Sequence, residues 1–363
     1  MRNTFGNNVL TTIFGESHGE GIGAVVDGLC AGIEVNEDYI NKILSLRRPV
    51  GAVSTARVEA DEYTIHSGVF EGKTTGTPIC ITIPNSDTRS KDYSQTKNLA
   101  RPSHADYTAH IKYKGFEDYR GGGHFSGRIT AALCAVGAIA LSALEKKGIY
   151  VGTHIKSLGG ILDRDFADIE KDINALCDMQ FAVLDKAAEE QMQNEILKAK
   201  ADGDSIGGML ETAVIGLPAG VGEPFFDSLE SVISHAVFSV PGVKGIEFGL
   251  GFGVCDKRGS EVNDPFEIRD GKVVTTTNNS GGINGGISNG MPVIFRTAMR
   301  PTPTLSKEQK TVDFEKMESA CLASRGRHDP CIVHRARVVV DCVVALALCD
   351  ELTSQFGKDW LGE

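Results

Sequence analysis

Two long stretches of the chain are almost free of polar residues, which predicts helices inside a core. Ile129 to Lys147 is apolar on nearly every face of a helix and is followed by Gly148, a residue type that often ends helices. Arg337 to Leu352 is a second, mostly apolar stretch of helical length. We therefore expect the first to be a buried helix and the second to be a further, mostly apolar helix.

Other segments carry the signals of helix starts. Asn36 precedes two acidic residues and an apolar face over residues 39–44, so it should cap a helix. The segment from Lys186 to Ala201 is amphipathic and charged, which predicts a helix at the surface.

Two further helix starts are expected from capping boxes, in which the side chains of residues i and i+3 satisfy backbone N–H groups reciprocally. Asp227 with Glu230 forms one such pair before an apolar helical pattern, and Ser306 with Gln309 forms the other.

Strands are predicted where short apolar or alternating runs are bounded by turn residues. The candidates are Leu10–Phe14, Ala24–Val26, Ile79–Ile83, Gly208–Ile215, Lys244–Phe248 and Pro292–Thr297. Helices and strands follow one another without a regular β-α-β rhythm, which favours an α+β fold. No linker-like segment divides the chain, so residues 1–363 are interpreted as one domain.

Glycines gather in four places, at residues 15–23, 121–127, 245–253 and 281–290. Some of these are expected to be hairpin turns, but such clusters also mark close approach of the backbone to a ligand. The most informative is Arg120–Arg128, in which three glycines and a histidine lie between two arginines just before the first apolar helix. Exposed backbone N–H groups, arginines and a helix N-terminus together predict a site for a multiply charged anion.

The charge distribution agrees with a small anionic ligand. The chain of 363 residues has a net charge of −11, which argues against a nucleic-acid-binding protein. Its arginines and histidines nevertheless concentrate in residues 101–128 and 325–337. Two solvated basic loops are the alternative interpretation.

Cysteine usage and the N-terminus indicate a cytoplasmic protein. The nine cysteines include no CxxC pair, so we expect free thiols in a reducing compartment and no metal site. The first ten residues lack the pattern of a secretory signal. The apolar stretch Val338–Cys349 is too short to span a bilayer and contains Asp341, so no membrane segment is expected.

Residues 15–19 fit the G-x-S-x-G pattern of a hydrolase nucleophile elbow, with Ser17 as nucleophile. That elbow requires a helix directly after it, whereas Ala24–Val26 indicates a second strand, so the hydrolase interpretation is the weaker one. His18 alone is typical of a histidine in a glycine-rich turn.

The segment Arg101–Asp106 places His104 beside an arginine and an aspartate that could orient it. Near the glycine loop, such a histidine could donate a proton to a departing phosphate. The sequence contains neither the Rossmann glycine fingerprint nor a P-loop, so it supports neither of these nucleotide sites.

Taken in order, six segments resemble chorismate synthases. They are Phe14–Gly19 (FGESHG), Arg101–Tyr107 (RPSHADY), Asp118–Gly123 (DYRGGG), Lys244–Phe248 (KGIEF), Asn278–Gly290 and Gly326–Cys331 (GRHDPC). Each segment is weak alone, but six in order across almost the whole chain are specific. The resemblance implies a single-domain α+β sandwich, usually a homotetramer, that converts 5-enolpyruvylshikimate 3-phosphate to chorismate and phosphate with reduced FMN. It also associates the chain with NADP.

The resemblance assigns roles to individual residues. His18 and His104 would be an acid–base pair, one for the leaving phosphate and one for the N1 region of the flavin. Asp329 would act with flavin N5 in removing the C6 proton. Substrate or flavin anions would be held by Arg47, Arg101, Arg128 and Arg327. Flavin contacts would come from Ser17, His124, Phe125, Ser126, Pro241, Gly242, Gly285, Arg300, Pro301, Thr302, Pro303, Thr304 and Arg327.

The chain departs from the family pattern at several of these positions. His124 and Phe125 stand where the family commonly has arginine and serine, and Pro241-Gly242 stands where it commonly has Asn-Ala. An arginine that many members carry shortly after Pro49 is missing from residues 50–56. No segment remains for a flavin reductase domain, so the resemblance implies an external source of reduced flavin.

Overall fold

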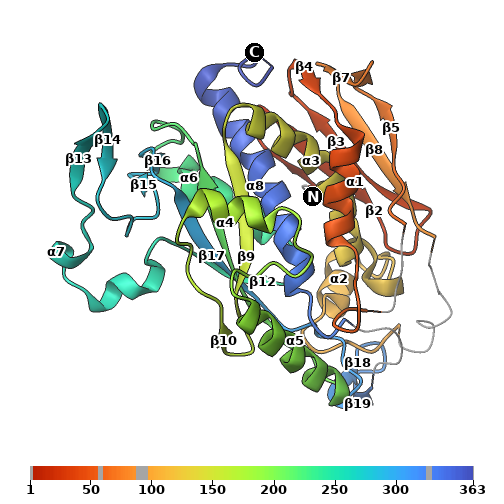
Figure 1. The fold of residues 1–363 in the computed structure, drawn as a ribbon. Coiled ribbons are helices and arrows are strands. Elements are labelled where there is room, and N and C mark those ends of the chain that lie inside the picture. Colours follow the sequence, from red (N-terminus) through yellow and green to blue (C-terminus); the bar gives the residue numbers. More distant parts are fainter. Residues whose placement is uncertain (1–2, 56–59, 87–96, 324–328, 363) are drawn as a thin grey trace.

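The computed structural model describes residues 3–55, 60–86, 97–323 and 329–362. Two antiparallel five-stranded sheets lie on either side of a layer of helices (Figure 1). The first sheet has the order β1 (Thr4–Phe5), β2 (Leu10–Gly15), β3 (Gly21–Asp27), β8 (Ile79–Pro84), β5 (Thr64–Ser67). The second has the order β10 (Ile161–Leu162), β9 (Tyr150–Leu158), β11 (Gly208–Ile215), β17 (Val293–Met299), β12 (Val243–Phe248).

Smaller sheets extend this frame. One has the order β4 (Ala31–Glu34), β7 (Lys73–Thr75), β6 (Val69–Phe70). Three are hairpins: β13 (Phe266–Arg269) with β14 (Lys272–Thr275), β15 (Ile283–Asn284) with β16 (Ile287–Ser288), and β18 (Gln309–Asp313) with β19 (Glu318–Leu322). The β13–β14 hairpin and the short α7 (Gly259–Val262) project from the body as an arm (Figure 1).

The other helices are α1 (Glu37–Arg47), α2 (Asp106–Tyr113), α3 (Thr130–Lys146), α4 (Ile169–Leu176), α5 (Lys186–Ala201), α6 (Leu229–Phe238) and α8 (Val333–Phe356). Helix α3 packs on β3 and β8 of the first sheet, and α8 packs on β9 and β11 of the second. The two helices also pack on each other, so they join the sheets through one core.

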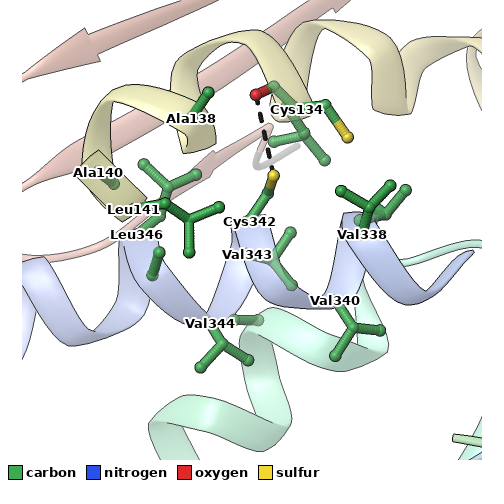
Figure 2. Packing of buried hydrophobic residues seen from close by; sticks show 14 of the residues in the cluster. Cys134, Ala138, Ala140, Leu141, Val338, Val340, Cys342, Val343, Val344 and Leu346 are labelled. Carbon is green, nitrogen blue, oxygen red and sulfur yellow. Dashed lines mark hydrogen bonds between the residues drawn. The ribbon is translucent and has the colours of Figure 1, made fainter. Parts of the chain in front are cut away.

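The contact between α3 and α8 is close because of one glycine. A Cβ at Gly137 would lie 2.9 Å from the Cα of Cys342 on α8, so only glycine lets the helices approach this far. One turn away, the Cys342 thiol faces the carbonyl of Cys134 at 3.8 Å, among alanine, valine and leucine side chains (Figure 2). Gly127–Lys146 is long and apolar enough to cross a membrane, but 89% of its apolar window is buried in this core. Its composition is therefore that of a central core helix.

Most predicted elements are confirmed. All six strand candidates coincide with strands, apart from Pro292, which precedes β17, and α5 and β11 have the predicted bounds. Asn36 caps α1 by accepting a hydrogen bond from the N–H of Tyr39 at 3.0 Å.

Both predicted capping boxes are wrong. Helix α6 is capped by Ser228, whose hydroxyl accepts from the N–H of Ser231, while Asp227 lies in the preceding 3-10 turn. Gln309 begins strand β18 because it pairs with Leu322 across a hairpin, so tertiary pairing overrides the local capping signal at Ser306.

The hydrolase interpretation also fails on the fold. The turn that holds Ser17 connects β2 to β3, which pair as an antiparallel hairpin. A nucleophile elbow needs a helix in the place of β3.

Candidate active site

The three-glycine loop determines where two histidines lie. Gly121, Gly122 and Gly123 all have positive φ, at 59°, 91° and 53°, within a short 3-10 segment, Arg120–Phe125. The ring of His18 occupies the space that a Cβ on Gly121 would need, and the ring of His104 lies 3.3 Å from the corresponding position on Gly122. The loop therefore seats His18 and His104, which are 86 positions apart in the sequence, on consecutive residues.

His18 is held by the β2–β3 turn. Ser17 is fully buried, and its hydroxyl lies 3.1 Å from Nδ1 of His18. The Ser17 N–H donates to the carbonyl of Gly123 at 3.1 Å, which joins the turn to the glycine loop. Ser17 thus orients His18 and is not placed as a hydrolase nucleophile.

His104 is oriented by a carboxylate, as the sequence indicated. Its Nδ1 lies 2.7 Å from Oδ1 of Asp106. The same carboxylate accepts two side-chain hydrogen bonds from Arg101, at 2.7 Å on Oδ1 and at 2.8 Å on Oδ2. Burial lowers the pKa of His104, and the hydrogen bond to the carboxylate of Asp106 opposes that effect only in part. The imidazole is therefore mostly neutral at neutral pH, and its protonated form is a stronger acid than an exposed histidine.

The turn after β17 lies beside this histidine. The guanidinium of Arg300 donates to the carbonyl of Ser103, next to His104, and the N–H of Arg300 donates to the carbonyl of Gly242 at 2.9 Å. Antiparallel pairing of Val243 with Met299 explains why residues 241–242 and 300–304 meet. The hydroxyl of Thr302 is buried without a hydrogen-bond partner in the described part of the chain. It is a polar group available to a ligand.

Two predicted substrate arginines share one buried carboxylate. The guanidiniums of Arg47 and Arg128 both pair with Asp61. The side chain of Arg47 is 6% exposed, that of Arg128 is 4% exposed and that of Asp61 is 1% exposed. Arg47 also donates to the carbonyl of Gly127 at 2.8 Å and to the hydroxyl of Thr130 at 2.9 Å. Burial is the main cause that lowers the pKa of Arg47, to about 10, which still leaves it protonated at neutral pH.

Asp329 lies next to this arginine cluster. Its Oδ1 accepts from the N–H of Thr55 at 3.2 Å, and its Oδ2 pairs with Arg335 on α8. Arg335 in turn donates to the carbonyl of Arg47 at 2.9 Å. Burial raises the pKa of Asp329, although Arg335 opposes the shift. A carboxylate with a raised pKa is suited to accept a proton.

The remaining loop residues have local structural contacts. His124 lies with Nδ1 2.8 Å from the carbonyl of Gly15, and Phe125 packs edge-on against Tyr113. Ser126 accepts from the N–H of Arg128 at 3.2 Å and so caps the turn before α3.

A cavity of about 340 Å³ opens beside these residues. His104, Gly122, His124 and Phe125 line one side of it. Its other walls include the aromatic rings of Phe14, Tyr113, Phe116 and Tyr119. The volume and aromatic lining are typical of small-molecule sites.

One predicted site residue is not brought to this place. Gly285 lies in the turn of the β15–β16 hairpin, which adjoins the start of β17. Arg300, in contrast, follows the end of β17. Seven strand residues separate the two ends by about 20 Å, so Gly285 of the same chain is remote from His104. Arg327 lies outside the described residues.

Several groups at the site were not found from the sequence. Asp61 carries no local signal, because its role appears only when α1 and the start of α3 meet around it. Arg335 belongs to the cation-rich segment noted in the sequence, but its partner Asp329 could not be assigned from spacing alone.

Comparison with known proteins agrees with this geometry. Residues 9–353 match the family model described as chorismate synthase. The chain is 47% identical over 351 residues to the chorismate synthase of Pyrococcus abyssi, with 96% of each chain covered. It is 45% identical over 353 residues to that of Archaeoglobus fulgidus, covering 97% of this chain and 98% of the relative.

A solved structure shows the same fold. A crystal structure of chorismate synthase superposes with a TM-score of 0.77 at 30% identity, covering 97% of this chain and 94% of the other. The α+β fold class is therefore confirmed. The chain belongs to the chorismate synthase family, the carbon–oxygen lyases that eliminate phosphate from 5-enolpyruvylshikimate 3-phosphate in the last step of the shikimate pathway.

Proposed function

We propose that His18, His104 and Asp329 are the proton-transfer groups of this lyase. The observation that carries the proposal is that His18 and His104 flank one glycine loop, with Asp329 joined to the same region through Arg335 and Arg47. One histidine protonates the leaving phosphate and the other serves the N1 region of the flavin. Asp329, with its raised pKa, takes part in removing the C6 proton.

The charge around the site favours a substrate with two carboxylates and a phosphate. Within the described part of the chain, the four arginines Arg47, Arg48, Arg128 and Arg335 pair with two carboxylates, Asp61 and Asp329. Among these six side chains positive charge exceeds negative charge, in a largely buried region where electrostatic attraction is weakly screened. We assign anion binding to Arg47, Arg101, Arg128 and Arg327, the arginines that the resemblance to the family indicates, and the charge around Arg47 and Arg128 supports this for those two.

The enzyme needs a reduced flavin, and we propose that this flavin is FMN. Ser17, His124–Ser126, Pro241-Gly242, Gly285, residues 300–304 and Arg327 are the groups proposed to hold it. The buried hydroxyl of Thr302, which has no hydrogen-bond partner among the described residues, supports this, because such a group is costly unless a ligand satisfies it. Bound reduced flavin supplies electron density for cleavage of the C–O bond.

We also propose a cytoplasmic homotetramer that takes reduced flavin from an external source. The apolar side chains exposed on the projecting arm support self-association. The link to NADP stays a prediction from the resemblance.

An anaerobic assay tests the proposed chemistry. The protein is mixed with photoreduced FMN and 5-enolpyruvylshikimate 3-phosphate, and phosphate release and chorismate absorbance are followed together, with oxidised FMN as the control. We expect equal amounts of both products only with reduced flavin. Replacement of His18 or His104 by alanine, or of Asp329 by asparagine, should lower turnover by roughly two to four orders of magnitude. Near-normal turnover of any one variant removes that residue from the mechanism.

A further inference from the structure

Asp329 is held by two elements that come from distant parts of the chain. Arg335, on the first turn of α8, pairs with one carboxylate oxygen, and the backbone N–H of Thr55 donates to the other at 3.2 Å. The first contact is set by a rigid helix. The second depends on a loop without regular secondary structure, over residues 52–55.

The loop of residues 52–55 is anchored by a buried serine–histidine pair. The hydroxyl of Ser54 lies 2.8 Å from Nε2 of His334, and the two residues are 2% and 1% exposed. His334 directly precedes Arg335 and stacks on Phe181 at a ring distance of 5.7 Å. His334 precedes Arg335, which pairs with Asp329, and Ser54 precedes Thr55, whose N–H bonds to Asp329. The contact between His334 and Ser54 therefore holds the helix and the loop together beside Asp329.

A third anchor comes from α5. The ammonium group of Lys200 donates to the carbonyl of Ala52 at 2.6 Å. The loop is thus tied to α5 at Ala52, to α8 at Ser54 and to Asp329 at Thr55. Ser54 is the middle anchor and is adjacent to the N–H that reaches Asp329.

His334 suits this task because it stays uncharged. Burial and the neighbouring Arg335 lower its pKa to about 3. A protonated ring would repel Arg335 and compete for Asp329, whereas the neutral ring bonds to Ser54 without altering the ion pair. Burying this histidine reduces stability, since its Nδ1 is a buried polar atom with no hydrogen-bond partner in the described residues.

We propose that Ser54, His334 and Arg335 are positioning residues for Asp329, which set the direction of its carboxylate and its readiness to take a proton. This inference rests on the proposed role of Asp329. The two groups that contact the Asp329 carboxylate both stabilise its ionised form, Arg335 by charge and the Thr55 N–H by a hydrogen bond. Among the described residues, the other charged or titratable groups near this carboxylate are Lys200 on α5 and the buried thiol of Cys331, with Arg47 beyond Arg335.

The first test needs no turnover. Carbon-13 carboxyl resonances of labelled aspartate, assigned with Asp329→Asn, give the pKa of Asp329 in the whole protein. Arg335→Gln should raise that pKa because a cation is lost, and Ser54→Ala should raise it by a smaller amount because the Thr55 hydrogen bond is loosened. The matched controls are Arg164→Gln, which removes the ion pair of Arg164 with Asp172 of α4, and Ser67→Ala, which removes an exposed hydroxyl bonded to a carbonyl. An Asp329 pKa that is unchanged in both site variants overturns the proposal.

The second test separates this inference from the role of Asp329 itself. Ser54→Ala and His334→Ala should each lower kcat several-fold with little change in KM and should shift the pH profile in the direction seen by NMR. Added to Asp329→Asn, Ser54→Ala should have no further effect, because the residue acts through Asp329. If Asp329→Asn turned over normally while Arg335→Gln and Ser54→Ala still shifted the pKa of Asp329, the catalytic role would be refuted and the positioning would stand. Additive losses in the double variant would refute the positioning.

Discussion

At the scale of single residues, the site depends on the absence of a side chain at Gly121. Its φ is positive, and its Cβ position coincides with the His18 ring and lies 2.9 Å from the hydroxyl of Ser17. Gly121→Ala should therefore push His18 out of place and lower kcat at least about 100-fold, as expected for loss of an acid–base group. Turnover and thermal unfolding would be measured together.

Gly160→Ala is the matched control for backbone strain. Gly160 also has a positive φ, of 85°, but nothing lies within 4 Å of its Cβ position. We expect a similar loss of stability in both variants and a loss of turnover only in Gly121→Ala. Equal turnover would show that His18 adjusts or is not needed.

Asp106 sets the protonation of His104, and this gives a pH-dependent prediction. Its hydrogen bond and charge raise the pKa of His104 against burial, so Asp106→Asn should lower that pKa further. The limb of the kcat–pH profile that reports His104 should move to lower pH, and kcat should fall about tenfold or more. Asp172→Asn, which breaks a similar arginine pair at Arg164, is the control and should leave the profile in place. An unmoved limb would mean that His104 does not titrate in turnover.

Sequence reasoning at this scale succeeded where partners are neighbours and failed where they are distant. Asp106 lies two positions from His104, so its role could be predicted. Asp61 joins Arg47 and Arg128 only after folding, and the pairing of Ser54 with His334 spans 280 positions. Arg47 and Arg128, two of the arginines that the resemblance assigns to substrate, are accordingly also structural, since removing either one leaves Asp61 short of a buried partner.

At the scale of elements, polar residues inside a sheet hid one strand from the sequence pattern. Strand β9 was not predicted because Thr153 and His154 are fully buried, which breaks the expected alternation. His154 lies between Asp163 at 2.7 Å and Glu211 of β11 at 3.1 Å. The buried ring therefore links β9 to β11 and to the segment after β10.

This link should make stability depend on pH. Although burial opposes it, hydrogen bonding to Asp163 and Glu211 raises the pKa of His154 above its ordinary value. The contribution of protonated His154 to the free energy of unfolding is then complete below about pH 6.5 and is lost as the pH rises through the raised pKa. Replacing His154 by glutamine should reduce the free energy of unfolding more at acidic than at alkaline pH, measured by urea unfolding. His235→Gln, which removes a ring that packs edge-on against Phe5, is the control, and a loss independent of pH would refute the assignment.

At the scale of the whole molecule, the fold gathers the site from both ends of the chain. The β2–β3 turn, the glycine loop before α3 and the start of α8 meet because α3 and α8 pack together between the two sheets (Figure 1). The order of the six motifs in the sequence could identify the family, but only this packing places Asp329 beside Arg47. The same topology leaves Gly285 at the far end of β17, so the flavin contact proposed for Gly285 requires the proposed assembly, in which another copy of the chain would supply it.

The projecting arm gives the prediction for assembly. Phe252, Phe266 and Ile268 on or beside it are 80%, 66% and 71% exposed, which is unusual for apolar side chains of an isolated surface. If these residues meet a second copy, Phe252→Glu combined with Phe266→Glu should convert the proposed tetramer to smaller species, because charge would be buried in the contact. Light scattering after gel filtration measures the mass, and FMN titration measures whether binding weakens with it. Phe70→Glu, at a phenylalanine 69% exposed on β6, is the control. A mass unchanged by the double substitution would place the interface elsewhere, and unchanged flavin binding in a dissociated protein would exclude Gly285 as a contact from a neighbouring copy.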